Sequence, residues 1–203
     1  MSEAALFAMG PVLAPERAPA VSVEHELTRA ALDGDGRAFA TLVRPHLGLL
    51  FRVAVRACGD AALAEDAVQE TLTVAYQSLG RYQPGTSLKA FLAAIAVKRA
   101  HTLLRAERRR HARERTADLG EQPATPAEML SAARTAERVR NALDAMPEKR
   151  RAVALLRLDA GLGYAEIAQA LDTTEGSARV LVHHALADLE ETLADLIGRP
   201  EEK

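Results

Sequence analysis

The chain has 203 residues, a formal net charge of −2, no Trp and a single cysteine, Cys58. This length suits one or two small domains, and one cysteine excludes an intrachain disulfide. No apolar run approaches the ~20 residues of a membrane span, and residues 1–22 lack the charged start and apolar stretch of a signal peptide. A composition rich in Ala, Leu, Arg and Glu favours helices. We therefore expect a cytoplasmic, all-α protein with no membrane span.

The near-neutral net charge hides a strong local asymmetry. Residues 98–115 are dense in Lys and Arg and have Glu107 and Glu114 as their only acids. Residues 186–196 carry acidic side chains and no base. Charge distributed in this way predicts that only one part of the chain meets a polyanionic partner.

The first third of the chain predicts a tail followed by two helices. Residues 1–22 mix Ala with several prolines and are predicted to form a disordered tail. A short helix is expected at 23–32, and the Asp-Gly-Asp-Gly run after it ends that helix. Apolar residues then recur at helical spacing over 37–58. Pro45 lies inside this pattern and is predicted to kink the helix or to mark a boundary.

Residues 63–110 predict two helices joined by a short loop. The first helix begins with an acidic, amide-rich patch formed by Glu65, Asp66, Gln69 and Glu70. Asp66, Gln69 and Glu70 lie three and four residues apart, so they share one helical face. On charge alone, the pattern predicts an ordinary solvated face with favourable first-turn charge.

The loop GRYQPGTS and the helix after it predict a nucleic-acid contact. Pro84 and Gly85 are turn residues, and Thr86 or Ser87 can cap the next helix. We expect Tyr82 to be exposed on the loop, where its ring could stack on an unpaired base. The helix from Ser87 to about residue 113 ends in basic residues that could follow DNA phosphates. Its alternative is a solvated charged helix end. The candidate DNA contacts in this part of the chain are Tyr82, Ser87, Lys89, Lys98, Arg99, Arg105, Arg108 and Arg109.

The C-terminal third predicts a helix-turn-helix. Residues 114–127 contain Pro and Gly and are predicted to be a linker, with helices following to about 145 and over 148–158. A helix over 162–171, a turn at 172–174 and a capping Thr174 complete the motif, whose second helix enters the DNA major groove. The candidate contacts on that second helix are Ser177, Arg179, His183 and His184.

Two stretches resemble the RNA polymerase sigma factors of bacteria, in particular the short ECF (extracytoplasmic-function) branch. AEDAVQETLTVAYQSLGRYQPGTSLKAFLAAIA is similar to sigma region 2, and MPEKRRAVALLRLDAGLGYAEIAQALDTTEGSARVLVHHALADLEETL is similar to region 4. The resemblance implies two small helical domains joined by a flexible linker, the second a winged-helix-like helix-turn-helix. The domain boundaries that we expect are 1–22 (tail), 23–113 (region 2), 114–127 (linker) and 128–198 (region 4).

The resemblance also implies partners and roles. The patch of Glu65, Asp66, Gln69 and Glu70 would bind core RNA polymerase, and the loop with the basic helix would bind the minus-ten promoter element. Region 4 would contact the upstream promoter element, and an anti-sigma factor would control the protein. We find no nucleophile–base constellation, metal-ligand spacing or Gly-rich phosphate loop, so we expect no catalysis, no cofactor and no metal.

One departure from the family pattern leaves a second interpretation open. Arg179 is the only firm cation of the expected recognition helix, and Leu181, Leu186 and Asp188 stand at positions that are often basic in the family. Region 4 would then bind DNA weakly, or present this surface to a protein. The alternative function is a sigma-like protein-interaction module that sequesters or mimics, with weakened DNA binding.

Overall fold

The computed structural model describes residues 18–114 and 137–197, and every regular element within these ranges is a helix. The predicted all-α class is thus confirmed. With no strand in the described ranges, the winged-helix-like form expected for the C-terminal half is not found, and its helix-turn-helix consists of helices alone. The elements are α1 (Ala18–Leu32), α2 (Gly36–Val43), the 3-10 turn η1 (Arg44–His46), α3 (Leu47–Cys58), α4 (Ala61–Gln77), the 3-10 turn η2 (Leu79–Arg81), α5 (Leu88–Glu114), a helical segment at 137–145, α7 (Glu148–Leu158), α8 (Tyr164–Ala170) and α9 (Glu175–Ile197).

Local sequence signals set most helix boundaries. Pro45 sits in η1, which separates α2 from α3, so the predicted boundary is confirmed. Gly59 has a φ of 72°, a left-handed conformation that ends α3 and that Gly adopts without strain. Asp60 then caps α4 by accepting a hydrogen bond of 2.8 Å from the backbone N–H of Leu63. Ser87 caps α5 in the same way through the N–H of Ala90, at 3.2 Å.

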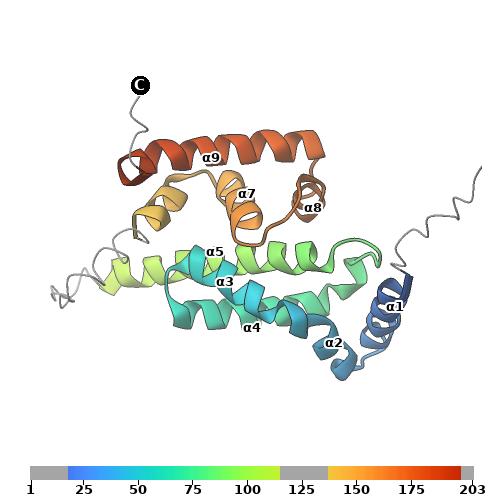
Figure 1. Cartoon of the computed structure of the whole chain (residues 1–203). Helices are drawn as coiled ribbons and strands as arrows, with labels where there is room; N and C mark the ends of the chain where they lie inside the picture. Colours follow the sequence, from blue (N-terminus) through green and yellow to red (C-terminus); the bar gives the residue numbers. More distant parts are fainter. Residues whose placement is uncertain (1–17, 115–136, 198–203) are drawn as a thin grey trace, which may run out of the picture.

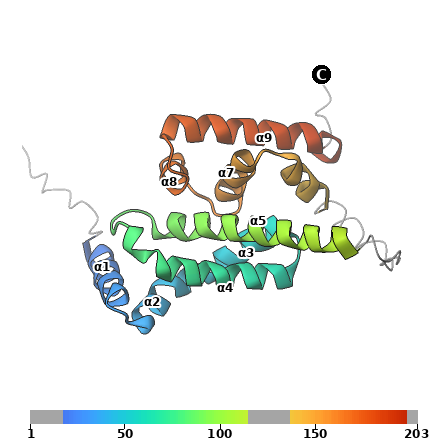
Figure 2. The same ribbon diagram turned by 180° about the vertical axis from the view of Figure 1, so that it is seen from behind.

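The 27 residues of α5 form the central helix of the molecule. Helices α3 and α4 pack against one side of it, and α7 and α8 pack against another side (Figure 1). Helix α9 lies beyond α7 and α8, away from α5, and the view from behind shows the same order (Figure 2). Helices α1 and α2 lie at the end of the molecule where α5 begins.

The two predicted domains share one hydrophobic cluster. Small residues on α5, among them Ala93 and Ala100, allow close packing of the neighbouring helices. From the N-terminal half the cluster takes Val53, and from the C-terminal half it takes Leu156 and Leu162, all three fully buried. A second cluster packs α1, α2 and η2 against the first half of α5. The described halves are therefore in direct contact along α5.

The structure bears on three of the expected boundaries. The tail was predicted to end at residue 22, but α1 begins at Ala18, so residues 18–22 are helical. Residues 1–17 lie outside the described residues. The predicted linker 114–127 also lies outside them, except that Glu114 is the last residue of α5. The helix expected to end near residue 145 does so, since residues 137–145 are helical.

The stretch Gly36–Cys58 is long and apolar enough to cross a membrane by length and composition alone, which the sequence patterns did not single out. Core helices of soluble proteins pass the same test. The 3-10 turn η1 interrupts this stretch, and Leu50, Val53 and Ala54 of α3 are fully buried in the protein. We therefore assign the stretch to the core.

His101 is a buried polar residue on α5, facing the C-terminal half. Its side chain is 3% exposed, and its Nε2 atom has no hydrogen-bond partner. Burial, together with the nearby positive charge of Arg151, lowers the pKa of His101 to about 4. Arg105, Asp144 and Glu148 also face the ring, with the carboxylates acting in the opposite direction. The folded chain therefore holds this imidazole in its neutral form.

This depressed pKa predicts a loss of stability in acid. Between about pH 4 and pH 6.5 the folded chain binds fewer protons at His101 than the unfolded chain does. The contribution of His101 to the free energy of unfolding is therefore complete above pH 6.5 and is lost as the pH falls toward about 4. His101→Leu should flatten the dependence of the urea midpoint on pH across this window. Urea titrations of both proteins above pH 6.5 and at about pH 5 test this. An equal midpoint shift in the two proteins would contradict it.

Candidate nucleic-acid interface

The acidic patch of α4 lies on the surface. Glu65, Asp66 and Gln69 are exposed, and Glu70 is half-buried. Among the described residues, the side chain of Asp66 makes no hydrogen bond or ion pair, so its charge is available to a partner. The same helix buries Ala64, Ala67, Thr71 and Ala75 on its opposite side. The amphipathic arrangement predicted from the spacing is thus present, with the patch pointing to solvent.

The expectation that Tyr82 is exposed is wrong, because the ring is only 5% exposed. Its hydroxyl donates a hydrogen bond to the carboxylate of Glu24 on α1, and the carbonyl of Thr86 lies 3.1 Å away. Burial, followed by the hydrogen bond to Glu24, raises the pKa of Tyr82 well above its usual range. Helix α1 thereby covers the residue that the loop alone would have left open, and stacking on a base would require α1 to move.

The other aromatic residues differ in exposure. Phe91 is half-buried against Tyr82, with ring centroids 5.6 Å apart. Tyr76 is 40% exposed, and its ring packs edge-to-face against Phe39 with the ring centroids 5.1 Å apart. Tyr76 therefore offers a more accessible ring than Tyr82 in this conformation.

The basic residues of α5 fall into two groups, and the first group is open to solvent. Lys98 and Arg109 are exposed and lie eleven residues apart, close to three full helical turns, so they share one face. Arg99 is half-buried, and its Nε atom has no hydrogen-bond partner. Lys98 and Arg109 can meet phosphates without any rearrangement of the described residues.

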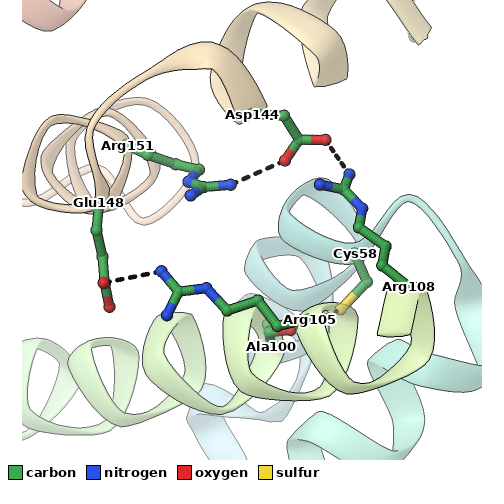
Figure 3. Close-up of polar contacts among 7 residues, drawn as sticks. All are labelled: Cys58, Ala100, Arg105, Arg108, Asp144, Glu148 and Arg151. Atoms are coloured by element: carbon green, nitrogen blue, oxygen red, sulfur yellow. Dashed lines mark hydrogen bonds and ion pairs between the residues drawn. The ribbon is translucent and has the colours of Figure 1, made fainter. Parts of the chain in front are cut away.

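The second group is engaged by the C-terminal half (Figure 3). Arg105 lies 2.9 Å from the carboxylate of Glu148, and this hydrogen bond lowers the pKa of Glu148. Arg108 forms an ion pair with Asp144, whose other oxygen lies 2.8 Å from Arg151. Both arginines of α5 therefore point toward carboxylates of the opposite half.

Two further candidate DNA contacts meet the start of the helix-turn-helix. The hydroxyl of Ser87 donates a 2.6 Å hydrogen bond to Glu166, and Lys89 lies 3.5 Å from the carbonyl of Gly161. Burial opposes ionisation of Glu166, but the hydrogen bonds from Ser87 and from the Gly163 backbone outweigh it and lower the pKa of Glu166. The first turn of α5 is thus held by the C-terminal half as well.

The recognition helix of the helix-turn-helix is α9, and its outer face is open. The hydroxyl of Thr174 accepts from the N–H of Ser177 at 3.1 Å, so the predicted cap is confirmed. Ser177, Arg179, His183 and His184 are all exposed, and Val180 between them is 55% exposed. The opposite side of α9 packs into the shared cluster through Ala178, Val182, Ala185 and Leu189.

Arg179 is held in place by its neighbours. Its guanidinium lies 3.1 Å from Glu175 and 5.0 Å from the centre of the Tyr164 ring. Arg157 approaches the same ring at 5.0 Å, so Tyr164 contacts two guanidinium groups. The side chain of Arg179 nevertheless stays 64% exposed, which leaves it available to an anionic partner.

Cys58 is a packing residue of the core. Its thiol lies 3.6 Å from the carbonyl of Ala100 on α5 and is buried (Figure 3). Burial, with a smaller effect of Asp60, raises the pKa of Cys58 to about 11. The thiolate is the reactive form of cysteine, so this environment keeps the side chain unreactive.

The sequence did not identify the carboxylates that engage α5. Asp144, Glu148 and Glu166 lie 36, 43 and 79 residues away from the side chains that they contact. Contacts between such distant positions leave no periodic signal in one sequence. The only available hint was an excess of acidic residues in the C-terminal half.

Comparison with known proteins places both halves in one class. Residues 42–110 match the sigma-70 region 2 family, and residues 136–189 match the sigma-70 region 4 family. These ranges contain the acidic patch, most of the basic helix α5 and the helix-turn-helix. The geometry and the two matches together define a sigma-70-type transcription factor.

Individual relatives specify the branch. The RNA polymerase sigma factor CarQ of Myxococcus xanthus is 32% identical over 168 residues, which is 81% of this chain and 94% of CarQ. The ECF RNA polymerase sigma factor SigL of Mycobacterium tuberculosis is 31% identical over 174 residues, which is 82% of this chain and 97% of SigL. The chain belongs to the ECF family of RNA polymerase sigma factors.

Solved structures support the fold. CnrH, in complex with the cytosolic domain of CnrY, has a TM-score of 0.63 and 22% sequence identity, and the match covers 85% of this chain and 98% of CnrH. The sigma factor RpoE in complex with the anti-sigma factor NepR from Bartonella quintana has a TM-score of 0.55 and 23% sequence identity. This match covers 77% of this chain and 96% of the RpoE chain. At sequence identities this low, the structural similarity shows a shared fold and nothing more.

Proposed function

We propose that this chain directs promoter-specific transcription initiation as an ECF sigma factor, acting in the cytoplasm and without catalysis of its own. The observation that carries the proposal is the presence, on one chain of this family, of two open surfaces. One is the acidic patch of α4, and the other is the outer face of α9 in the helix-turn-helix. A sigma factor needs one surface for polymerase and another for promoter DNA.

The acidic patch is the proposed polymerase-docking surface. Glu65, Asp66 and Gln69 are exposed on a helix whose other face is fixed in the core, so the patch is rigid before binding. A surface that is ordered in advance loses less conformational entropy on association. Asp66, which has no partner among the described residues, is the charge that we expect to matter most.

The DNA-binding surfaces are proposed on α5 and α9. Lys98 and Arg109 are open on α5, while Arg105 and Arg108 become available only if their carboxylate partners leave. Cations that neutralise phosphates supply affinity that falls with salt concentration. On α9, Arg179 and the neighbouring histidines face outward, as recognition-helix residues must.

An anti-sigma factor is the proposed regulator. RpoE, one of the structural neighbours, was solved bound to the anti-sigma factor NepR, and CnrH was solved bound to the cytosolic domain of CnrY. Both proteins share their fold with this chain across most of its length. We therefore expect an anti-sigma factor to bind this chain as well.

A sigma-like interaction module is the second candidate. It is favoured by α9, in which Arg179 is the only Lys or Arg and the second half carries Asp188, Glu190 and Glu191. Acidic side chains on this helix repel phosphates, which weakens non-specific DNA binding. Such a module would bind polymerase without selecting promoters.

One capture experiment separates the two candidates. Core RNA polymerase would be incubated with genomic fragments from the source organism, with and without the chain, and the retained fragments sequenced. A sigma factor should enrich fragments that share two spaced sequence elements. Stable binding of the chain to polymerase without any enrichment would contradict the sigma function and favour the interaction module.

Arg179→Ala should weaken binding to the upstream element. Loss of a cation that contacts a base edge costs about 1–3 kcal/mol, and no second Lys or Arg on α9 can replace it. The measurement is the affinity of the chain–polymerase complex for a fragment enriched as above. Lys149→Ala, which removes another exposed cation, on α7, is the matched control. Equal affinities for the two variants would show that Arg179 does not contact the DNA.

A further inference from the structure

Arg179 is the only Lys or Arg on α9, so its position is decisive for any DNA contact of that helix. It lies near the start of α9, where a recognition helix contacts base edges. An Arg side chain has many rotamers, and fixing one of them on binding costs conformational entropy. A single cation can therefore discriminate between bases only as well as its position is defined before binding.

Two neighbours contact the guanidinium of Arg179. Its central carbon lies 5.0 Å from the centre of the Tyr164 ring, within the range of a cation–π interaction. Its Nη2 atom donates a hydrogen bond of 3.1 Å to the carboxylate of Glu175, one turn earlier on α9. Both side chains of this ion pair are more than half exposed, and an exposed pair is screened by salt and contributes little. The ring is therefore the contact less sensitive to solvent and salt.

Tyr164 is itself held in place by the fold. It is the first residue of α8 and is half-buried against the shared cluster. The backbone just before it is fixed, because the N–H of Gly163 donates a hydrogen bond of 2.8 Å to Glu166. Glu166 also accepts a hydrogen bond from Ser87 of α5. A ring fixed in this way can limit the motion of a guanidinium that packs against it.

The same arrangement leaves Arg179 able to bind a base. The hydrogen bond to Glu175 uses one of the five N–H donors of the guanidinium. Guanine presents O6 and N7 in the major groove, and a two-bond contact of Arg with these atoms is the commonest specific contact to DNA. Tyr164 and Arg179 line one hollow of the surface together with His183 and His184. A base edge that enters this hollow would meet a guanidinium already in contact with the ring.

We propose that Tyr164 is a positioning residue for Arg179, and that the positioned guanidinium selects a guanine in the upstream promoter element. Tyr164 limits the motion of the guanidinium before DNA binds, and Arg179 contacts the base. Arg157 also approaches the ring at 5.0 Å, but it donates a hydrogen bond of 2.8 Å to the carbonyl of Leu162, which ties it to the turn before α8. This inference rests on the proposed function, because it names the base that the same recognition helix reads.

The first test needs no DNA. The Nε–H signal of Arg179 is assigned in nitrogen–proton spectra of the full chain by its loss in Arg179→Ala, and its order parameter is measured by relaxation. Tyr164→Leu should lower this order parameter, whereas Tyr164→Phe, which keeps the ring, should leave it unchanged. Tyr164→Met, another apolar side chain without a ring, repeats the comparison if Tyr164→Leu folds poorly.

The second test measures discrimination at single base pairs. The chain–polymerase complex is titrated with a fragment from the capture experiment, and with versions in which each base pair of the upstream element is changed in turn. Arg179→Ala identifies the base pair that Arg179 reads, which should be G·C, because discrimination is lost there. Tyr164→Leu should reduce discrimination at the same base pair by about twofold to fivefold, the scale of an exposed cation–π contact.

Two comparisons exclude a merely structural role of Tyr164. Tyr164→Leu should leave discrimination at the other base pairs unchanged, whereas a distorted helix-turn-helix would weaken it at all of them. In the background of Arg179→Ala, Tyr164→Leu should have no further effect at the G·C pair, since the ring acts through Arg179. Tyr164→Phe is the matched control and should discriminate as the unchanged chain does.

The outcomes separate this inference from the proposed function. A mobile Arg179 and a loss confined to one G·C pair in Tyr164→Leu, both restored in Tyr164→Phe, support the inference. An unchanged order parameter, a loss spread over all base pairs, or a further loss in the double variant overturns it, and so does a base pair other than G·C. If the unchanged chain enriches no fragments, the sigma function fails, and the order parameter of Arg179 still decides whether Tyr164 positions it.

Discussion

Asp66→Lys is expected to abolish binding of the chain to core RNA polymerase. The substitution reverses an exposed charge at the centre of the acidic patch, between Glu65 and Gln69. Losing a hydrogen-bonded charge at an interface costs about 2–5 kcal/mol, which is roughly 30-fold to several-thousand-fold in Kd. The measurement is a pull-down, followed by a titration of labelled chain with core polymerase.

The fold should survive this change, because the Asp66 side chain makes no hydrogen bond or ion pair among the described residues. Thermal unfolding of the variant should match that of the unchanged chain. Glu190→Lys, the same charge reversal at an exposed position of α9, is the matched control and should bind polymerase normally. Retained binding by Asp66→Lys, with a normal fold, would remove the docking role from α4.

Leu156→Ala is expected to lower the free energy of unfolding more than any other substitution proposed for this chain. Leu156 on α7 is 0% exposed and belongs to the cluster that both halves share. Replacing a buried Leu by Ala loses transfer free energy and leaves a cavity, at a cost of about 2–5 kcal/mol. The measurement is the free energy of unfolding from a urea titration.

Leu158 provides the control for this prediction two residues further along. It is 55% exposed, so Leu158→Ala should change the free energy of unfolding by only about 0.5 kcal/mol. The difference between the two variants isolates burial from helix propensity, because both replace Leu by Ala in the same helix. Equal losses in the two variants would contradict the packing of α7 in the shared cluster.

Local signals in the sequence predicted the helices well. Pro45, Asp60 and Thr174 each lie at the boundary that their chemistry favours, because caps and proline effects act within a few residues. The exposed face of α4 followed from spacing alone, since three- and four-residue intervals fix which side chains share a face.

Long-range contacts explain the predictions that failed. Tyr82 was expected on an open loop, but Glu24, 58 residues away, covers it together with α1. The contacts of Arg105 and Arg108 likewise depend on how the C-terminal half packs against α5. A single sequence shows that a helix is basic, but not which carboxylates will meet it after folding.

The most direct test of the sigma function is transcription in a reconstituted reaction. Purified chain would be added to core RNA polymerase on genomic fragments from its source, and the 5′ ends of the transcripts would be sequenced. The account predicts new starts that depend on the chain, share two spaced upstream elements and disappear with Asp66→Lys. Firm binding to core polymerase without any new start would contradict it.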